Sequence, residues 1–310
     1  MTGPIVVTGV AGLLGGAVAT LLTSEGSRVL GLDRRRPQRT AGFPFEIDDL
    51  SDAGVLTRRF EGAAAVIHCA AIARLGDAPE AEIFSNNTAT TMNVVLAAEA
   101  AGVKRLVYAS SQSALGLAYA PRVVTPDYLP VDEAHPARPL EAYGLSKLVG
   151  EGICEMAARR GRLACLALRF PVIWHEAAFA ECTGRRLGNE TQAAKSQWAY
   201  VDLRDAARAC AIAIRAQVGA PFRVFNIGAP WPFNMPDPAA ALARYYDDKV
   251  AIRTGWKPGD AVFSAERAQI DLGFLAEWEW RVDKIVRHAT IGRQGSVALL
   301  GRDSVGDPPA

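Results

Sequence analysis

Hydrophobic residues form short continuous runs, separated by longer stretches in which apolar positions recur with helical spacing. The runs are typical of strands buried on both faces of a parallel sheet. The longer stretches are typical of helices packed on such a sheet. The predicted strands are residues 5–8, 28–32, 65–67, 105–110, 163–170 and 222–227, and the predicted helices are 17–23, 81–101, 143–159 and 202–216. Their alternation predicts an α/β fold with a doubly wound parallel sheet.

The pattern changes after residue 228, where prolines end the alternation. Residues 238–246, 262–273 and 279–291 then predict a small mixed region. We expect a sheet domain from residues 1–170 and 198–228 and a smaller, interleaved C-terminal lobe from residues 171–197 and 229–291. Residues 292–310 contain Gly, Pro and Ser without periodicity, which predicts a flexible tail.

Composition narrows the class of protein. Half of the 310 residues are hydrophobic, and 34 Lys and Arg oppose 33 Asp and Glu. This balance argues against a disordered chain and against a dedicated nucleic-acid binder. The five cysteines include no Cys-x-x-Cys, so we expect neither a disulfide framework nor a metal site, and a cytoplasmic location fits best.

No charged side chain occurs in residues 1–24, which raises the alternative of a signal peptide or membrane helix. Such a segment would need a basic start, which is absent, and this one carries five glycines. We therefore expect a protein with no membrane partner.

The better interpretation is a phosphate-binding turn. Gly9, Gly12 and Gly15 lie between the first strand and the first helix. Such glycines permit a tight turn, close approach of a pyrophosphate, and packing of helix on strand. Asp33 ends the next strand, where a carboxylate accepts hydrogen bonds from the adenine ribose of NAD. Because Arg34 to Arg36 could hold the extra phosphate of NADP, that cofactor stays open as the less favoured alternative.

Candidate catalytic groups follow later strands. Ser111 ends a buried strand, and Tyr143 and Lys147 share one helix face at i and i+4. A nearby ammonium favours the phenolate, so such a tyrosine can exchange a proton with a substrate hydroxyl. Tyr245 and Lys249 match the same spacing, but they lie outside the alternating region. We therefore expect the second pair to be a surface helix end.

The chain resembles the extended short-chain dehydrogenases/reductases of the NAD-dependent epimerase/dehydratase family over residues 3–228. The shared stretches are Thr8-Gly9-x-x-Gly12-x-x-Gly15, Asp33, Asp49-Leu50, His68-Cys69-Ala70-Ala71, Asn87, Asn93, Tyr108-Ala109-Ser110-Ser111, Tyr143-x-x-x-Lys147, Glu151, Tyr200-Val201-Asp202-x-x-Asp205 and Asn226-Ile227-Gly228. The resemblance implies a Rossmann fold, NAD as cofactor, and a homodimer formed through helices 81–101 and 143–159. It implies cofactor contacts from Gly9, Ala11, Gly12, Leu13, Leu14, Gly15, Asp33, Arg34, Asp49, Leu50, Cys69, Ala70, Ala71, Asn87, Ser110, Tyr143, Lys147, Phe170 and Val172. His68 is expected to be a core histidine, and Asp202 and Asp205 helix caps.

Three departures bear on the substrate. Dehydratases of the family carry an Asp-Glu pair where this chain has Gln112 and Ser113, so dehydration is disfavoured. Val172 stands where nucleotide-sugar members usually have an asparagine. The segment from 174 to 201 is also shorter than theirs, which disfavours their usual diphosphate pocket.

Residues 110–116 and 195–198 are similar to the uronate dehydrogenases, a subgroup that oxidises free sugar acids. The substrate contacts expected are Arg74, Ser111, Gln112, Trp174 and Lys195, with Arg185, Arg186 and Gln197 as further candidates. The leading hypothesis is an NAD-dependent oxidoreductase acting on a secondary alcohol of a sugar, sugar acid or polyol. A nucleotide-sugar 4-epimerase and a non-catalytic cofactor-sensing protein are the alternatives.

Overall fold

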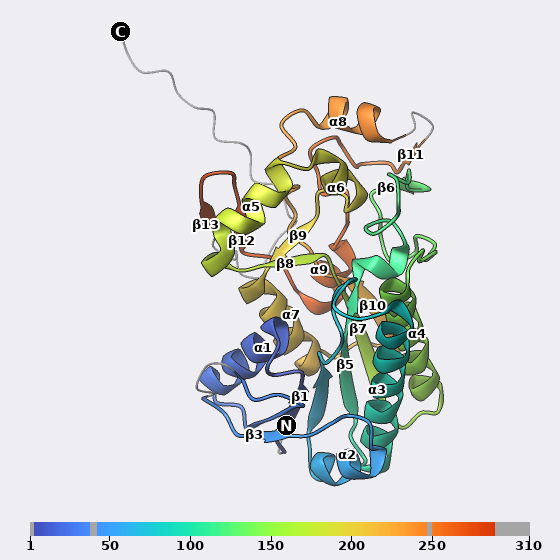
Figure 1. Cartoon of the computed structure of the whole chain (residues 1–310), viewed down its shortest axis with the longest axis vertical. Helices are drawn as coiled ribbons and strands as arrows, with labels where there is room; N and C mark the ends of the chain where they lie inside the picture. Colours follow the sequence, from blue (N-terminus) through green and yellow to red (C-terminus); the bar gives the residue numbers. More distant parts are fainter. Residues whose placement is uncertain (1–2, 38–41, 247–249, 289–310) are drawn as a thin grey trace.

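The computed structural model describes residues 3–37, 42–246 and 250–288. Its centre is a parallel seven-stranded sheet in the order β10-β7-β5-β4-β1-β2-β3 (Figure 1). The strands are β1 (Ile5–Thr8), β2 (Val29–Asp33), β3 (Phe45–Ile47), β4 (Ala65–His68), β5 (Arg105–Ser111), β7 (Ala164–Phe170) and β10 (Phe222–Asn226). The predicted α/β fold with a doubly wound sheet is confirmed, and β3 is the strand that the hydrophobic pattern missed.

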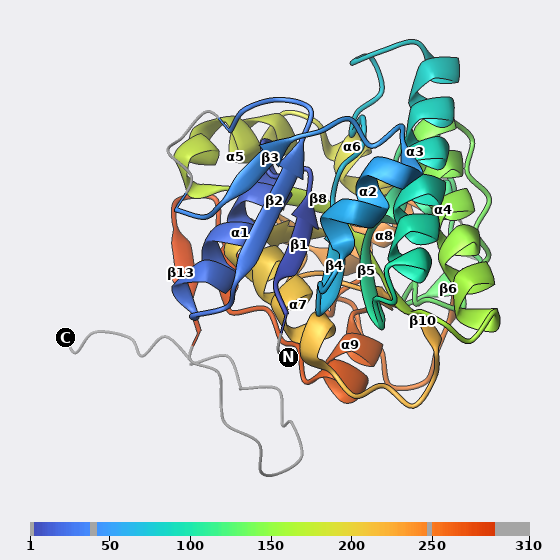
Figure 2. The same cartoon turned by 90° about the horizontal axis from the view of Figure 1, so that it is seen from below.

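Helices cover both faces of the sheet (Figure 2). One face carries α1 (Leu13–Ser24) and α7 (Leu203–Arg215), and the other carries α2 (Ala53–Phe60), α3 (Glu80–Ala100) and α4 (Ala142–Arg159). Neighbouring strand residues point to opposite faces, so Val7 packs in the core under α1 and Val6 in the core under α3. This burial on both faces explains why the strands appear in the sequence as continuous apolar runs.

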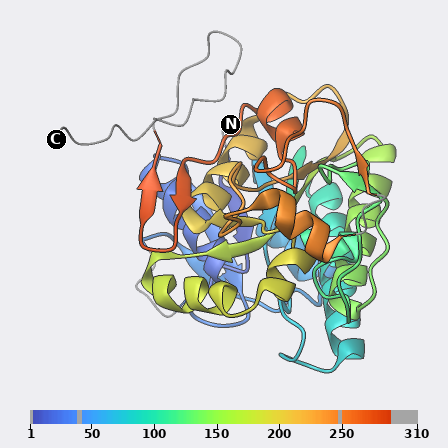
Figure 3. The same cartoon turned by 90° about the horizontal axis from the view of Figure 1, so that it is seen from above.

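Shorter elements lie beyond the strand ends. Before β10 these are η1 (Gln112–Leu115), β6 (Tyr128–Leu129), β8 (Val172–Trp174), η2 (Glu176–Ala178), α5 (Phe179–Leu187), α6 (Glu190–Lys195) and β9 (Tyr200–Asp202). From here on, the term "C-terminal lobe" is restricted to the described residues after 228. Figure 3 shows them in orange and red. The lobe contains α8 (Pro238–Tyr245), β11 (Ala251–Ile252), α9 (Glu266–Leu272), β12 (Trp278–Trp280) and β13 (Ile285–Arg287). The expected tail at 292–310 lies outside the described residues.

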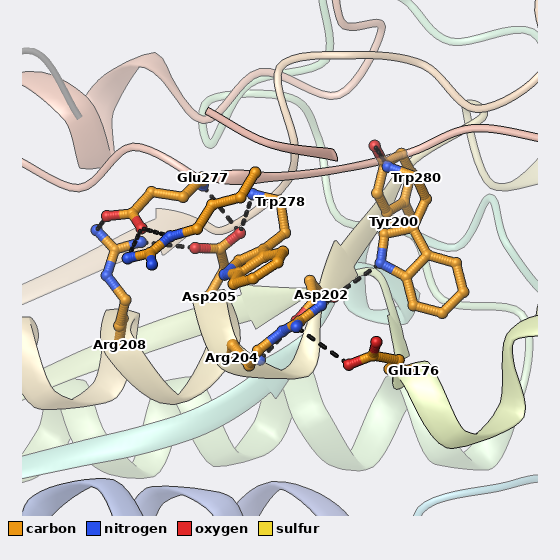
Figure 4. Close-up of polar contacts among 10 residues, drawn as sticks. Glu176, Tyr200, Asp202, Arg204, Asp205, Arg208, Glu277, Trp278 and Trp280 are labelled. Carbon is orange, nitrogen blue, oxygen red and sulfur yellow. Dashed lines mark hydrogen bonds and ion pairs between the residues drawn. The ribbon is translucent and has the colours of Figure 1, made fainter. Parts of the chain in front are cut away.

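Two carboxylates attach the β12–β13 hairpin to α7 (Figure 4). Asp202 caps the N-terminus of α7 and accepts a hydrogen bond from the Trp280 indole at 2.8 Å. Asp205 accepts bonds from the backbone N–H groups of Glu277 and Trp278, both at 2.9 Å. Asp202 is thus the expected cap, whereas Asp205 serves the hairpin instead.

Within the described ranges, no helix is both long and apolar enough to cross a membrane.

Candidate active site

A cavity of about 920 Å³ opens at the carboxyl ends of the sheet strands. After β1 the chain continues to β2 on one side, and it later returns to β4 on the other. In doubly wound sheets this change of direction leaves a crevice in which ligands bind. Gly9, Asp33, Cys69 and Ser111, which end or follow four of these strands, all line the cavity.

The turn after β1 can be built only with glycine at two positions. Gly9 has a φ of +80°, and a Cβ there would lie 2.6 Å from the backbone nitrogen of Ala70. A Cβ on Gly15 would lie 2.3 Å from the carbonyl oxygen of Gly9. Because both obstacles are backbone atoms, neither can move aside without distorting the turn.

The N-terminus of α1 faces the cavity without a side-chain cap. Gly12 is the N-cap residue and supplies no side-chain hydrogen bond, and Leu13 and Leu14 line the cavity. The free N–H groups and the positive end of the helix dipole therefore suit an anionic phosphate. This arrangement fits the pyrophosphate of a dinucleotide.

The Asp33 carboxylate is held by two backbone groups. Its Oδ2 accepts a bond from Ala11 N–H and its Oδ1 one from Arg35 N–H, both at 2.9 Å. The carboxylate still lines the cavity and retains lone pairs for the hydroxyls of an adenine ribose. Arg34 and Arg35 line the same end of the cavity.

Ser111, Tyr143 and Lys147 meet in the cavity wall. The Ser111 hydroxyl lies beside the phenol of Tyr143, and Lys147 Nζ lies 5.7 Å from the centre of the Tyr143 ring. The Lys147 ammonium donates to the carbonyl of Ala109 at 2.8 Å, which holds it beside the end of β5. The three groups can thus share one substrate oxygen and its proton.

Burial changes the proton affinities of this group. It raises the pKa of Tyr143, while the neighbouring Ser111 hydroxyl lowers it. Burial also lowers the pKa of Lys147 to about 8, against the raising effect of acidic neighbours such as Glu151. The ammonium therefore keeps its charge at neutral pH and favours the phenolate form of Tyr143.

A buried ion pair supports the wall from behind. Ser110 Oγ donates to Glu151 Oε1 at 2.6 Å, and Arg169 donates to both oxygens of Glu151 at 2.8 Å. The two charged side chains are each 6% exposed. Because Glu151 lies one turn after Lys147 on α4, this pair fixes α4 against the ends of β5 and β7.

Most residues predicted to hold cofactor or substrate line the cavity. They are Gly9, Gly12, Leu13, Leu14, Gly15, Asp33, Arg34, Asp49, Leu50, Cys69, Ala70, Ala71, Arg74, Ser110, Ser111, Gln112, Tyr143, Lys147, Phe170, Val172 and Trp174.

Three predicted residues lie elsewhere. Ala11 lies in the turn between β1 and α1, and its N–H donates to Asp33 Oδ2 at 2.9 Å. Asn87 is buried, and its amide group is occupied by the backbone of Ile72 and by Ser146 Oγ. Lys195 points away from the cavity and donates to the carbonyl of Pro121 at 3.3 Å. None of the three is among the residues lining the cavity, and the further candidate Gln197 does not line it either.

The lining also includes residues that sequence reasoning missed, among them Tyr119, Glu181, Cys182 and Gln192. No repeat or spacing marked these positions. Tyr119 lies edge-on to Tyr143, with ring centres 6.4 Å apart. Arg185 also lines the cavity and pairs with Glu181, whereas the side chain of Arg186 lies outside the described part.

The second Tyr-x-x-x-Lys match lies away from the cavity. Tyr245 ends α8 and donates its hydroxyl to Glu190 at 2.9 Å, and Lys249 lies outside the described residues. His68 is the expected core histidine, because its ring nitrogens bond Thr8 at 2.7 Å and Thr91 at 3.2 Å. Burial lowers the pKa of His68 to about 3, so the ring is neutral at pH 7.

Comparison with known proteins places the molecule among NAD-dependent enzymes of the short-chain dehydrogenase/reductase class. Residues 5–174 match the model of the NAD dependent epimerase/dehydratase family. Because this match covers more than half of the 310 residues, the chain belongs to that family, and NAD is its cofactor.

The individual relatives have more than one kind of activity. A UDP-glucose 4-epimerase of Streptomyces lividans is 28% identical, and the match covers 90% of this chain and 96% of that protein. An L-arabinose 1-dehydrogenase (NAD(P)(+)) of Haloferax volcanii is 34% identical, over 53% of this chain and 65% of that protein. A short-chain dehydrogenase/reductase superfamily protein from Agrobacterium tumefaciens, solved with bound NAD, superposes with a TM-score of 0.67 at 27% identity. That superposition covers 90% of this chain and 93% of the other.

Proposed function

We propose that the protein transfers a hydride between NAD and a secondary alcohol of a sugar, sugar acid or related small polyol. The observation that carries this proposal is the meeting of Ser111, Tyr143 and Lys147 in the same cavity as the glycine turn and Asp33. NAD, when bound there, would accept the hydride or return it. The residues of the chain would handle the proton and the orientation of the substrate.

Each member of the trio has a separate task. Tyr143 removes the hydroxyl proton as the carbinol carbon loses its hydride, and Lys147 favours the phenolate through its charge. Ser111 holds the same substrate oxygen by a hydrogen bond. The buried Ser110–Glu151–Arg169 group keeps the wall in place while the charge on Tyr143 changes.

The extent of the cavity supports a small substrate. The chain is described to residue 288, yet the last residue that lines the cavity is Ser196. The volume of about 920 Å³ lies near the upper end of the roughly 300–1,000 Å³ usual for one ligand. A dinucleotide together with a compact sugar suits this space better than two nucleotide-sized ligands.

The test is an absorbance screen for NADH or NADPH formation over free sugars, aldonates, uronates and UDP-sugars. We expect NADH formation with a small sugar or sugar acid. Tyr143→Phe should lower kcat/KM by about a thousandfold while the Kd for NADH stays unchanged. Tyr245→Phe is the matched control and should leave turnover intact; undiminished turnover in Tyr143→Phe would refute the assignment.

A 4-epimerase acting on a UDP-sugar is the second candidate. The match to the Streptomyces lividans epimerase along nearly the whole chain favours it. An epimerase returns the hydride to the other face of the sugar, so it forms no net NADH and retains its cofactor. Tightly bound NAD after purification, with interconversion of UDP-glucose and UDP-galactose, would decide for this candidate.

We also propose the wider organisation expected from the sequence. Residues 1–170 and 198–228 would bind the cofactor, and residues 171–197 and 229–291 would form the substrate-binding lobe. Within that lobe, residues 171–196 supply the cavity contacts, and the described residues after 228 would support them from outside the cavity. The protein would be a homodimer through α3 and α4, which sedimentation can test. A cytoplasmic location is supported by five cysteines that are all free.

A further inference from the structure

A pair of glutamines joins the C-terminal lobe to the substrate end of the cavity. Gln112 directly follows Ser111 and lines the cavity, and Gln197 lies behind it in the turn between α6 and β9. The two side chains are buried, at 2% and 1% exposure. Neither belongs to the proton-transfer trio, so their contacts call for a separate explanation.

Backbone carbonyls decide which way both amides face. Gln197 Nε2 donates to the carbonyl of Lys195, so its Oε1 faces Gln112 and accepts a bond from Gln112 Nε2. Gln112 Nε2 also donates to the carbonyl of Ser196 at 3.1 Å. A carbonyl oxygen can only accept, so reversing Gln112 would set its Oε1 against two oxygens. Reversing Gln197 would set its Oε1 against the Lys195 carbonyl and its Nε2 against the Nε2 of Gln112. Gln112 therefore donates both of its amide hydrogens to oxygens of the protein.

The C-terminal lobe reinforces this orientation. Tyr246, at the end of α8, donates its hydroxyl to the carbonyl of Ala194 at 2.8 Å, and this hydroxyl lies beside the Gln197 side chain. Although the lobe contributes no lining residue to the cavity, it thus contacts the residue that orients Gln112.

The backbone at this turn adopts an unfavourable conformation to make these contacts. Gln197 has a φ of +54° and Trp198 a φ of +51°, a region that residues other than glycine seldom occupy. Trp198 is held there by core packing and by a bond from its N–H to the carbonyl of Ala193 at 2.7 Å. Residues kept in such conformations are concentrated at functional sites.

We propose that Gln112 Oε1 accepts a hydrogen bond from a substrate hydroxyl on a carbon next to the reacting one, and that Gln197 is the positioning residue that keeps this oxygen toward the cavity. The inference rests on the proposed function and narrows its substrate class to polyols with a free hydroxyl beside the oxidised carbinol. An anionic or carbonyl group at that place would face the Gln112 oxygen without a proton to donate.

The test compares the sugar identified by the screen with its two deoxy analogues, each lacking the hydroxyl on one flanking carbon. Wild-type protein should prefer the full sugar over one analogue by about tenfold in kcat/KM, the worth of one buried hydrogen bond. Gln112→Met should bring this ratio near one by slowing the full sugar alone. Gln217→Met, at an exposed glutamine after α7, is the matched control and should keep the wild-type ratio.

Gln197→Met separates positioning from general structural support. With its Gln197 partner gone, only the Ser196 carbonyl still orients the Gln112 amide, so the preference should shrink severalfold while the Kd for NADH stays unchanged. A wild-type ratio in Gln112→Met, or an equal loss on all three sugars in Gln197→Met, would overturn the inference alone. If no sugar in the screen is turned over by the wild-type protein, the proposed function fails and this inference fails with it.

Discussion

The seven-stranded sheet and the C-terminal lobe contribute to the cavity in different ways. The ends of the sheet strands and the turns that follow them supply backbone and side-chain atoms directly, from Gly9 to Phe170. The described residues after 228 supply none to this cavity and act through α7 and the Gln197 turn. The sheet side of the cavity therefore depends on close backbone approach, as at Gly9 and Gly15. The C-terminal lobe depends on polar contacts between segments that are distant in the sequence.

Preventing the close approach of Gly15 to the Gly9 carbonyl should have the largest effect on activity. In Gly15→Ala the new Cβ would lie 2.3 Å from the Gly9 carbonyl oxygen, so the turn and the start of α1 must shift. A displacement of about 1 Å in a binding group lowers the reaction rate by on the order of a hundredfold. We therefore expect kcat/KM to fall by about a hundredfold and NADH to bind more weakly.

Gly152→Ala is the matched control for this change. Gly152 is an exposed residue of α4, and a Cβ there would meet no heavy atom within 4 Å. Alanine should raise the free energy of unfolding by about 0.5–1 kcal/mol and leave NADH binding unchanged. Equal kcat/KM and NADH affinity in the two variants would show that the close approach at Gly15 is not required.

Breaking the attachment of the lobe should have the next largest effect. Asp202→Ala removes the cap of α7 and leaves the buried Trp280 indole N–H and Arg204 without this partner. We expect the free energy of unfolding to fall by about 2–3 kcal/mol, measured by urea denaturation. Asp237→Ala removes an exposed cap of α8 and should cost only about 1 kcal/mol. Similar losses in both variants would contradict a special role for Asp202.

The same contrast explains what could be predicted from the sequence. Gly9, Gly15 and Asp33 were found because each place in the turn accepts few residue types, and the spacing to the next strand is regular. Tyr119 was missed because it reaches the cavity through a loop whose course depends on long-range packing. Strands of two or three residues, such as β3 and β8, leave no periodic pattern, since their pairing partners lie far along the chain.

Asn87 and Lys195 are predicted contacts that do not line the cavity. Both side chains are polar and lie near the site in the sequence pattern of the family, so a ligand contact was expected. The structure instead uses them to satisfy backbone carbonyls, Asn87 at Ile72 and Lys195 at Pro121. A sequence motif identifies a polar group but does not show whether protein or ligand is its partner.

Low pH should lower the free energy of unfolding through His68, at the end of β4, and this is the smallest effect that we expect. Burial, and then the Lys147 charge, lower the pKa of this ring to about 3 in the folded protein, whereas a histidine in the unfolded chain titrates near 6.5. The unfolded chain therefore binds the extra proton between these values, and stability is lost as pH falls below about 6.5. Between pH 7 and pH 5, wild-type protein should lose about 1–2 kcal/mol more than His68→Asn, measured by urea denaturation at both pH values. Parallel losses in the two proteins would mean that His68 takes up its proton without unfolding, and that the core around Thr8 and Thr91 tolerates the charge.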